Sequence, residues 1–290
     1  MNSLIPRDAD QLLASALAVI DEAFKTKAAK MFPLFSGGHD SLCACFVASH
    51  HPRFEGEVYH INTGIGSKKT REFVEEVCEE YGWNLRVYKS PATYEIFVRK
   101  RGFPGPGAHH WCYARIKERC IHQIMKGREP KLLITGCRQE ESKRRMGSVE
   151  PIKIGEVSPT TGKVANRKRI WTAPCFDWDH HEQRAFMNAF GLPRNPVKES
   201  ALGMSGECFC GAFARPGELE MIRQIVPDVA IEIERLQKIA RECGTPCNWG
   251  VRPDWEKGFV KSLTGPLCSS CDRRAMAAGI IVTEPCEITE

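Results

Sequence analysis

The sequence lacks the features of membrane, fibrous and repeat proteins. No apolar run approaches the roughly 20 residues that a membrane-spanning helix needs, and no internal repeat or low-complexity tract is present. The longest early apolar run, residues 12–20, lies between acidic residues, whereas a signal peptide begins with basic ones. These absences exclude a collagen-like or multispanning chain, and we expect a cytoplasmic protein without membrane contact.

The chain also carries little net charge. Lys and Arg number 41 against 36 Asp and Glu, a surplus too small for a DNA-packaging protein but compatible with an anionic partner. Length and composition fit a globular protein, because 290 residues with 42% apolar content make one large or two ordinary domains. The 14 cysteines are informative, since thiols in a reducing compartment are more often buried, metal-bound or catalytic than disulfide-bonded.

Short apolar runs alternate with helical patterns along most of the chain. The expected strands are 31–35, 57–62, 85–89, 131–135 and 170–173; the expected helices are 41–49, 68–81, 94–101, 114–125, 179–190, 216–225 and 228–241. Between the fourth and last strands, residues 146–169 predict a long loop or hairpin. Strands separated by helices predict an α/β fold with an open parallel, Rossmann-like sheet and helices on both faces.

This pattern divides the chain into three parts. We predict an N-terminal helical segment at 1–24, a nucleotide-binding α/β domain at 25–195 and a C-terminal helical, cysteine-rich lobe at 196–290. The last stretch, residues 243–290, is rich in Cys, Gly and Pro with little periodicity, which is typical of a lobe organised around something other than its own core.

One loop carries the sharpest chemical signal. Directly after the first expected strand the sequence reads Ser36, Gly37, Gly38, His39, Asp40 and Ser41. Glycines let the backbone approach an anion, serines offer hydroxyls, and the following helix points N–H groups and its positive dipole end at the same place. The loop lacks the ending of the Walker motif and the three-glycine dinucleotide fingerprint. It predicts an oxyanion cradle; the alternative is a glycine turn in which Asp40 and Ser41 cap the helix.

The loop resembles the PP-loop of the ATP pyrophosphatase superfamily, and later segments resemble the phosphoadenosine phosphosulfate (PAPS) reductase-like proteins in that family's order. The resemblance covers residues about 31–215. The later segments are Asn62-Thr63-Gly64, Trp111-Cys112-Tyr113 with Arg115 and Lys117, Thr135-Gly136-Cys137-Arg138 with Glu140, Glu141, Ser142 and Arg145, and Pro174 with Asp177-Trp178. Two departures are Asn62 in place of the usual acid and a single cysteine at Cys112.

The resemblance implies a fold of the adenine nucleotide alpha hydrolase type and a role for each matching residue. The loop from Ser36 to Ser41 would hold the pyrophosphate of ATP, with Asp40 helping Mg²⁺. The other nucleotide-binding residues would be Asn62, Thr63, Gly64, Gly136 and Arg138; the catalytic residues would be Asp40, Ser41, Lys117, Arg138 and Arg145. These motifs follow strands, whose carboxyl ends converge on one crevice, and the three basic side chains offer fixed positive charge to phosphates.

Closely spaced cysteines form a second constellation, because two thiolates in one turn bind a metal with little ordering cost. We expect a [4Fe-4S] cluster or a structural Zn²⁺ on Cys208, Cys210, Cys268 and Cys271, with Cys112 and the pair Cys243 and Cys247 in reserve. Spacing leaves both metals open, and the resemblance favours iron–sulfur. The remaining cysteines that lie in periodic or strand segments are expected to be small buried apolar residues: Cys43, Cys45, Cys78, Cys120, Cys137 and Cys175.

The resemblance leaves the reaction to be chosen between two chemistries. An intact Gly-Gly-x-Asp pattern favours ATP cleavage at the α-phosphate, with an acceptor adenylated and then displaced by sulfur, as in nucleic-acid thiolation. The reductases instead carry a C-terminal Glu-Cys-Gly-Leu-His segment, of which Glu242-Cys243-Gly244 retains half. A PAPS or adenylyl-sulfate reductase therefore stays open, as does a non-catalytic nucleotide-binding module with a zinc-stabilised tail.

The expected partners are an adenine nucleotide and a sulfur donor, with a nucleic acid as candidate acceptor. The basic stretch 166–169, with Trp171 close by, is a candidate for contacting a polyanion and stacking a base. A solvated basic loop is the alternative. The oligomeric state has no signal in the sequence.

Overall fold

The structure, a computed structural model, describes residues 7–105, 109–141, 150–157, 164–215 and 217–251. The predictions for Arg145, Cys268 and Cys271 fall outside these ranges. Within them, no helix is long and apolar enough to cross a membrane.

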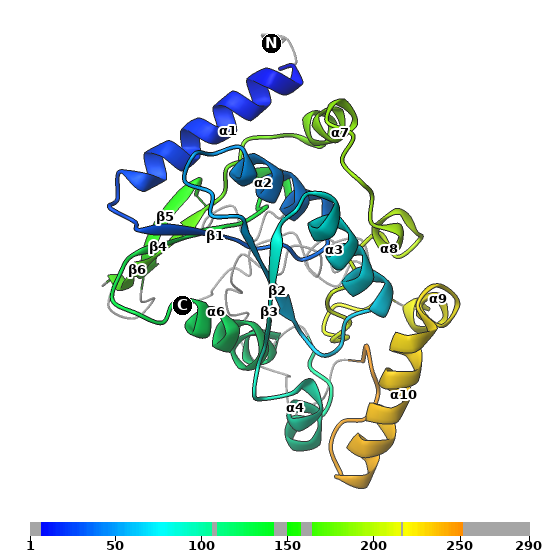
Figure 1. Cartoon of the computed structure of the whole chain (residues 1–290). Helices are drawn as coiled ribbons and strands as arrows, with labels where there is room; N and C mark the ends of the chain where they lie inside the picture. Colours follow the sequence, from blue (N-terminus) through cyan, green and yellow to red (C-terminus); the bar gives the residue numbers. More distant parts are fainter. Residues whose placement is uncertain (1–6, 106–108, 142–149, 158–163, 216, 252–290) are drawn as a thin grey trace, which may run out of the picture.

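The sheet confirms the predicted α/β fold (Figure 1). Strands β1 (Lys30–Pro33), β4 (Lys131–Ile134), β6 (Val164–Thr172) and β5 (Ile152–Val157) pair in the order β1-β4-β6-β5. Strands β2 (Glu57–Asn62) and β3 (Asn84–Lys89) pair in parallel, and a parallel bridge from Leu34 to Tyr59 joins them to β1. Since β1, β4 and β6 are also mutually parallel, these strands present their carboxyl ends at one edge.

The segment 146–169 contains strand β5 and the start of β6, which confirms the hairpin alternative expected there and leaves the sheet mainly parallel. Strand β5 pairs antiparallel with β6, with a register shift between Ile154 and Glu156. Strand β6 also begins at Val164, earlier than the expected residue 170. The sequence does not predict the start of β6 at Val164, because residues 166–168 are exposed and show no apolar strand pattern. Backbone pairing with β5, rather than an apolar face, holds that part of the strand.

The helices match most of the expected spans. They are α1 (Ala9–Phe24), α2 (His39–Ser49), α3 (Lys68–Glu80), α4 (Tyr94–Arg101), α5 (His109–Tyr113), α6 (Arg119–Ile124), α7 (His180–Ala189), α8 (Pro196–Glu199), α9 (Glu218–Ile225) and α10 (Pro227–Glu242). A π-helical turn, η1 (Ala114–Glu118), links α5 to α6, and a 3₁₀ turn, η2 (Gln139–Glu141), follows β4. The helix expected at 114–125 is present through Ile124, but it starts earlier, at His109, and its winding changes at η1.

Alternating strand residues bury two faces of the sheet. Met31, Leu132 and Ile170 join a core with α1, α2 and α7. Their neighbours Phe32, Leu133 and Trp171 join a second core with α6. Figure 1 shows α1 and α2 on one side of the sheet and α6 on the other. The sheet is thus covered on both faces, as a parallel sheet requires.

The predicted three-part division stays a prediction, but packing links its parts. Helix α1 buries Leu12, Ala16 and Ile20 completely, at helical spacing, in the core of the α/β sheet. A separate apolar cluster joins α4 and η1 to α10, and Tyr94 and Phe213 are buried in it. Segments assigned to different predicted domains thus share cores.

Candidate functional site

The predicted cradle lies where β1 runs into α2. Gly37 has a φ of 74°, and a Cβ at this residue would lie 2.7 Å from the Thr70 methyl carbon, so glycine is required there. Gly38 is the N-cap of α2 and offers no side chain to the helix end. The N–H groups of the first turn therefore depend on an outside acceptor, which is the arrangement that binds anions.

Ser41 organises the cradle from inside. Its hydroxyl donates to the carbonyl of Gly38 at 2.8 Å and accepts from the backbone N–H of Ser36 at 3.2 Å. The Ser36 hydroxyl lies 3.1 Å from the same oxygen. Because the single Ser41 proton is used on Gly38, Ser36 is the donor of this last bond. Ser41 therefore holds the loop in shape.

Arg138 lies in the loop after β4 and pairs with Asp40 at the start of α2. Its Nε donates to Oδ1 of Asp40 at 2.5 Å, and the side chains are 4% and 12% exposed. Gln183 of α7 donates to the same oxygen at 2.5 Å. Gly136 makes this approach possible, since a Cβ there would lie 2.2 Å from the carbonyl carbon of Asp40. The structure thus brings three predicted residues, Asp40, Gly136 and Arg138, together.

His39 adds no charge to the cradle near neutral pH. Burial lowers the pKa of His39 to about 4, and this effect outweighs the attraction of Glu199, whose carboxylate lies 3.6 Å from Nε2. With a neutral imidazole, positive potential beside the loop comes from the backbone dipoles and from cations such as Arg138, Lys198 and Arg194, of which the last two also lower the pKa of His39.

The predicted nucleotide loop follows β2. The side-chain oxygen of Asn62 accepts from the N–H of Gly64 at 2.9 Å, a short-range bond that shapes the turn. Thr63 is 3% exposed, and its N–H donates to a carboxylate oxygen of Glu207 at 2.9 Å. In this loop Asn62 therefore acts through its amide oxygen on the backbone, while Thr63 faces inward.

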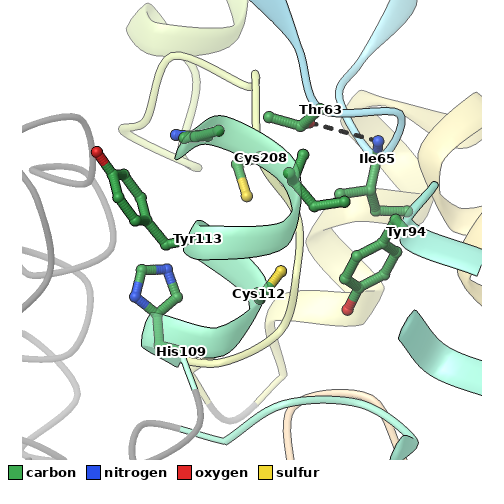
Figure 2. A pocket seen from close by; sticks show the side chains of 9 residues that line it. Thr63, Ile65, Tyr94, His109, Cys112, Tyr113 and Cys208 are labelled. Carbon is green, nitrogen blue, oxygen red and sulfur yellow. Dashed lines mark hydrogen bonds between the residues drawn. The ribbon is translucent and has the colours of Figure 1, made fainter. Parts of the chain in front are cut away.

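A small pocket, partly open to solvent, lies beside this loop. Its lining residues are Thr63, Ile65, Tyr94, His109, Cys112, Tyr113, Ile116, Lys117 and Cys208. Figure 2 shows Cys112 and Tyr113 on one helix, with Thr63 and Ile65 on the loop after β2. Lys117 is 9% exposed and belongs to the π-helical turn η1, a type of turn that is frequent at functional sites. The pocket unites two of the predicted motifs.

The cysteines confirm one expectation and leave another open. The six cysteines expected in the apolar core are buried: Cys43, Cys45, Cys78, Cys120, Cys137 and Cys175. Cys112 and Cys208 line the pocket, and the hydroxyl of buried Tyr94 donates to the Cys210 carbonyl at 2.7 Å. Burial raises the pKa of Tyr94, and the nearby thiols of Cys112, Cys210 and Cys208 raise it further.

The predicted metal ligands are tested only in part by this geometry. No group of three His, Cys, Asp or Glu side chains in the described ranges is arranged to hold a metal ion. The reserve residue Cys112 lines the same pocket as Cys208, whereas exposed Cys243 and half-buried Cys247 do not line it. The described residues alone therefore do not complete a four-thiolate site, and the assignment stays a prediction.

Three polar residues that support the site have no signal in the sequence. Gln183 lies in the middle of a helix, Asn195 in a proline-containing connector, and Glu207 beside the cysteines. Asn195 is fully buried and donates to the Gly37 carbonyl at 2.7 Å. Each contacts a partner more than 140 residues away, because their bonds to Asp40, Gly37 and Thr63 span 143, 158 and 144 residues. Only the folded chain brings these groups together.

The base-stacking role considered for Trp171 is wrong. Its ring is 7% exposed and packs in the core with α6. Arg169 is also buried and pairs with Glu118 at 2.6 Å. Asn166, Arg167 and Lys168 stay exposed, so part of the stretch still faces solvent.

Comparisons with known proteins give the following matches. A family model described as "Phosphoadenosine phosphosulfate reductase domain" matches residues 30–210. An uncharacterized protein of Methanocaldococcus jannaschii is 24% identical over 223 residues, which are 76% of this chain and 51% of that protein. The adenosine 5'-phosphosulfate reductase of Sinorhizobium fredii is 28% identical over 173 residues, 58% of this chain and 64% of that enzyme. The chain thus spans less than two thirds of the length of either relative.

Among solved structures, the chain is similar to the phosphoadenylyl-sulfate reductase of Candida auris in its phosphate complex. The TM-score is 0.44 at 19% identity, and the match covers 67% of this chain and 91% of that one.

Proposed function

The chain belongs to the phosphoadenosine phosphosulfate reductase domain family, and from this premise we propose that it is an enzyme that binds ATP and cleaves it at the α-phosphate. The acceptor is adenylated and then receives sulfur, with a nucleic acid as candidate acceptor. The observation that carries this proposal is the cradle, where Ser41 orders the loop and the first turn of α2 lacks a side-chain cap.

The described residues supply positive potential on the side where phosphates would lie. Backbone N–H groups at the start of α2 would bind the β- and γ-phosphates, and Arg138 would lie beside the α-phosphate. Lys117, from the pocket wall, is the second candidate cation for charge that develops in the transition state. Asp40 is the carboxylate that we expect to hold Mg²⁺, which would neutralise phosphate charge.

The proposed reaction has two displacements. An acceptor oxygen attacks the α-phosphorus, the bond to the bridging oxygen breaks, and pyrophosphate leaves with that electron pair. A sulfur nucleophile then attacks the activated carbon of the acceptor, and AMP leaves. The pocket favours sulfur delivery on the side of Cys112 and Cys208, because both thiols line it together with Lys117.

A [4Fe-4S] cluster, with Zn²⁺ as the alternative, remains part of the proposal. Cys208 and Cys210 are the proposed ligands among the described residues, completed by Cys268 and Cys271, with Cys112, which lines the same pocket as Cys208, as a reserve. No step above depends on the cluster. Anaerobic purification followed by an absorption spectrum and a metal count separates the choices: brown colour with iron and sulfide supports the cluster, and colourless protein with zinc contradicts it.

Labelled ATP tests the reaction. Pyrophosphate and AMP formation supports adenylation, and Ser36→Ala should slow pyrophosphate release about 100-fold or more if its bond to Ser41 keeps the cradle in shape. The matched control is Ser49→Ala, which removes a serine hydroxyl from the far end of the same helix, where it binds the Phe46 carbonyl. Equal rates in both variants would contradict the proposed site.

Reduction of a sulfonucleotide is the second candidate, favoured by the 28% identity to an adenosine 5'-phosphosulfate reductase. In that reaction a cysteine thiolate attacks the sulfur of the substrate, the nucleotide leaves, and a dithiol then releases sulfite. Sulfite release from PAPS or adenylyl-sulfate with thioredoxin, without pyrophosphate release from ATP, would select it. Nucleotide binding with neither turnover would select the non-catalytic module.

A further inference from the structure

The segment that carries Cys208 is bonded along its length to the loop after β2. We call residues 205–209 the strap and residues 62–67 the nucleotide loop. Their bonds run from the Ser67 N–H to the Gly206 carbonyl (2.8 Å), from the Thr63 hydroxyl to the Glu207 carbonyl (2.5 Å) and from the Phe209 N–H to the Ile65 carbonyl (3.0 Å). The backbones nearly touch, because a Cβ on Gly66 would lie 2.6 Å from the Glu207 carbonyl oxygen.

Glu207 also bonds through its side chain. Its Oε1 accepts the Thr63 N–H at 2.9 Å, and its Oε2 lies 3.2 Å from Nε2 of His60. His60 is in turn bonded through Nδ1 to the Phe35 carbonyl at 2.8 Å, at the end of β1. Glu207 and His60 are 4% and 2% exposed, so without the carboxylate the buried N–H of Thr63 would lose its acceptor.

The other end of the strap is linked to the cradle through Asn195. The amide of Asn195 donates both to the Gly37 carbonyl at 2.7 Å and to the Ser205 carbonyl at 2.9 Å. Thr70 donates to the same Ser205 carbonyl at 2.7 Å. The strap is therefore linked through Asn195 to the phosphate-facing loop and bonded directly to the nucleotide loop, with Cys208 in the span that Glu207 fixes.

We propose that Glu207 is a positioning residue that joins the nucleotide loop and the strap into one unit, so that a nucleotide bound at the cradle and loop orders Cys208 in the pocket wall. This inference rests on the proposed function for its nucleotide. It assigns to Glu207 a role that neither the cradle nor the thiols perform, which is to couple occupancy of the nucleotide site to the position of the thiol.

Hydrogen–deuterium exchange of the full-length protein as purified, with and without ATP, tests this coupling. In the wild type, ATP should slow exchange in peptides covering 36–45, 60–68 and 203–211. Glu207→Ala should keep the effect at 36–45 and lose it at 203–211, whereas Glu207→Gln should behave as the wild type, since its amide oxygen still accepts the Thr63 N–H. Continued slowing at 203–211 in Glu207→Ala would overturn the inference.

Hydrogen–deuterium exchange measured without ATP tests the positioning role of Glu207 independently of the proposed function. Glu207→Ala should speed exchange about tenfold in both 60–68 and 203–211, the consequence of one lost buried hydrogen bond. Equal exchange in wild type and Glu207→Ala would overturn the positioning role. Absence of any ATP effect at 36–45 in the wild type would instead refute the proposed function.

Two further variants serve as a substitute for Glu207→Ala and as a control. If Glu207→Ala fails to fold, Thr63→Val removes the hydroxyl that binds the Glu207 carbonyl while preserving side-chain shape, and it should weaken the ATP effect at 203–211. Glu220→Ala, at an exposed position of α9, should change neither peptide. The inference would also be contradicted if ATP slowed exchange at 203–211 in Thr63→Val as much as in the wild type while Glu220→Ala altered exchange in these peptides.

Discussion

Arg138 donates from Nε to Oδ1 of Asp40 at 2.5 Å, and this buried pair joins the loop after β4 to the start of α2 across 98 residues of sequence. Gln183 donates to the same carboxylate oxygen, and Gly136 leaves the space for the contact. The cradle is therefore held from outside by a charge pair, and a ligand phosphate would meet Arg138 already fixed in place.

Breaking that pair should destabilise the protein. We expect Arg138→Ala to lower the free energy of unfolding by about 3–5 kcal/mol, because it removes the cation that faces the buried Asp40 carboxylate. Urea denaturation measures this cost. In the double variant Asp40→Ala/Arg138→Ala the two losses should not add, since each single change already removes the same interaction. Additive costs would show that the two side chains act independently.

Gly136→Ala should be among the most damaging small changes in the chain. The added methyl would lie 2.4 Å from the backbone nitrogen of Ser41, so either β4 or the start of α2 must shift. We expect lower stability and weaker ATP binding in calorimetry. Gly191→Ala is the control: its φ is 62° but the added methyl meets no atom within 4 Å, so it should cost only about 1–2 kcal/mol. Equal costs would contradict the close approach.

His39 should titrate far below neutrality. Its folded-state pKa is lowered by burial to about 4 from 6.5, so the unfolded chain takes up this proton first as the pH falls. His39 therefore reduces stability between about pH 6.5 and pH 4 and has no such effect above that window. NMR titration of the ring and the stability difference between wild type and His39→Asn check this. A ring pKa above 6 would refute it.

The same neutrality bears on ligand binding. The ratio of ATP affinities of wild type and His39→Asn should stay constant from pH 5.5 to 8, as measured by calorimetry at constant ionic strength.

Glu57 should contribute stability that acid removes. Hydrogen bonds from Lys30 and Tyr59 outweigh burial and, with Arg86, lower the pKa of Glu57 to about 2 from 4.5. A lowered carboxyl pKa gives stability that is complete above the unfolded value and is lost as the pH falls toward 2. The advantage of the wild type over Glu57→Gln in urea denaturation should be constant above pH 5 and small near pH 2. A constant difference down to pH 2.5 would contradict this.

Local sequence was enough to predict the glycine–serine loop at 36–41, the strand-helix order and the family. Glycine and serine at 36–41 act on their own backbone and on the helix that follows, and helical spacing such as Leu12, Ala16 and Ile20 depends on neighbours within a few turns. These signals are local, so they can be read before the chain is folded. The hairpin of β5 and β6 is only partly visible in the sequence, because its exposed basic half carries no apolar period.

Long-range packing, in contrast, established what holds the cradle and what shares the pocket. Asp40 meets Arg138 and Gln183, and Glu207 meets Thr63, because packing of the sheet brings together segments separated by 98 to 144 residues. Packing of the folded chain also buries Trp171 and places Cys208 and Cys112 in the wall of one pocket. A hydrogen-bond partner or a burial depends on which surfaces meet in space, and no short stretch of sequence specifies that.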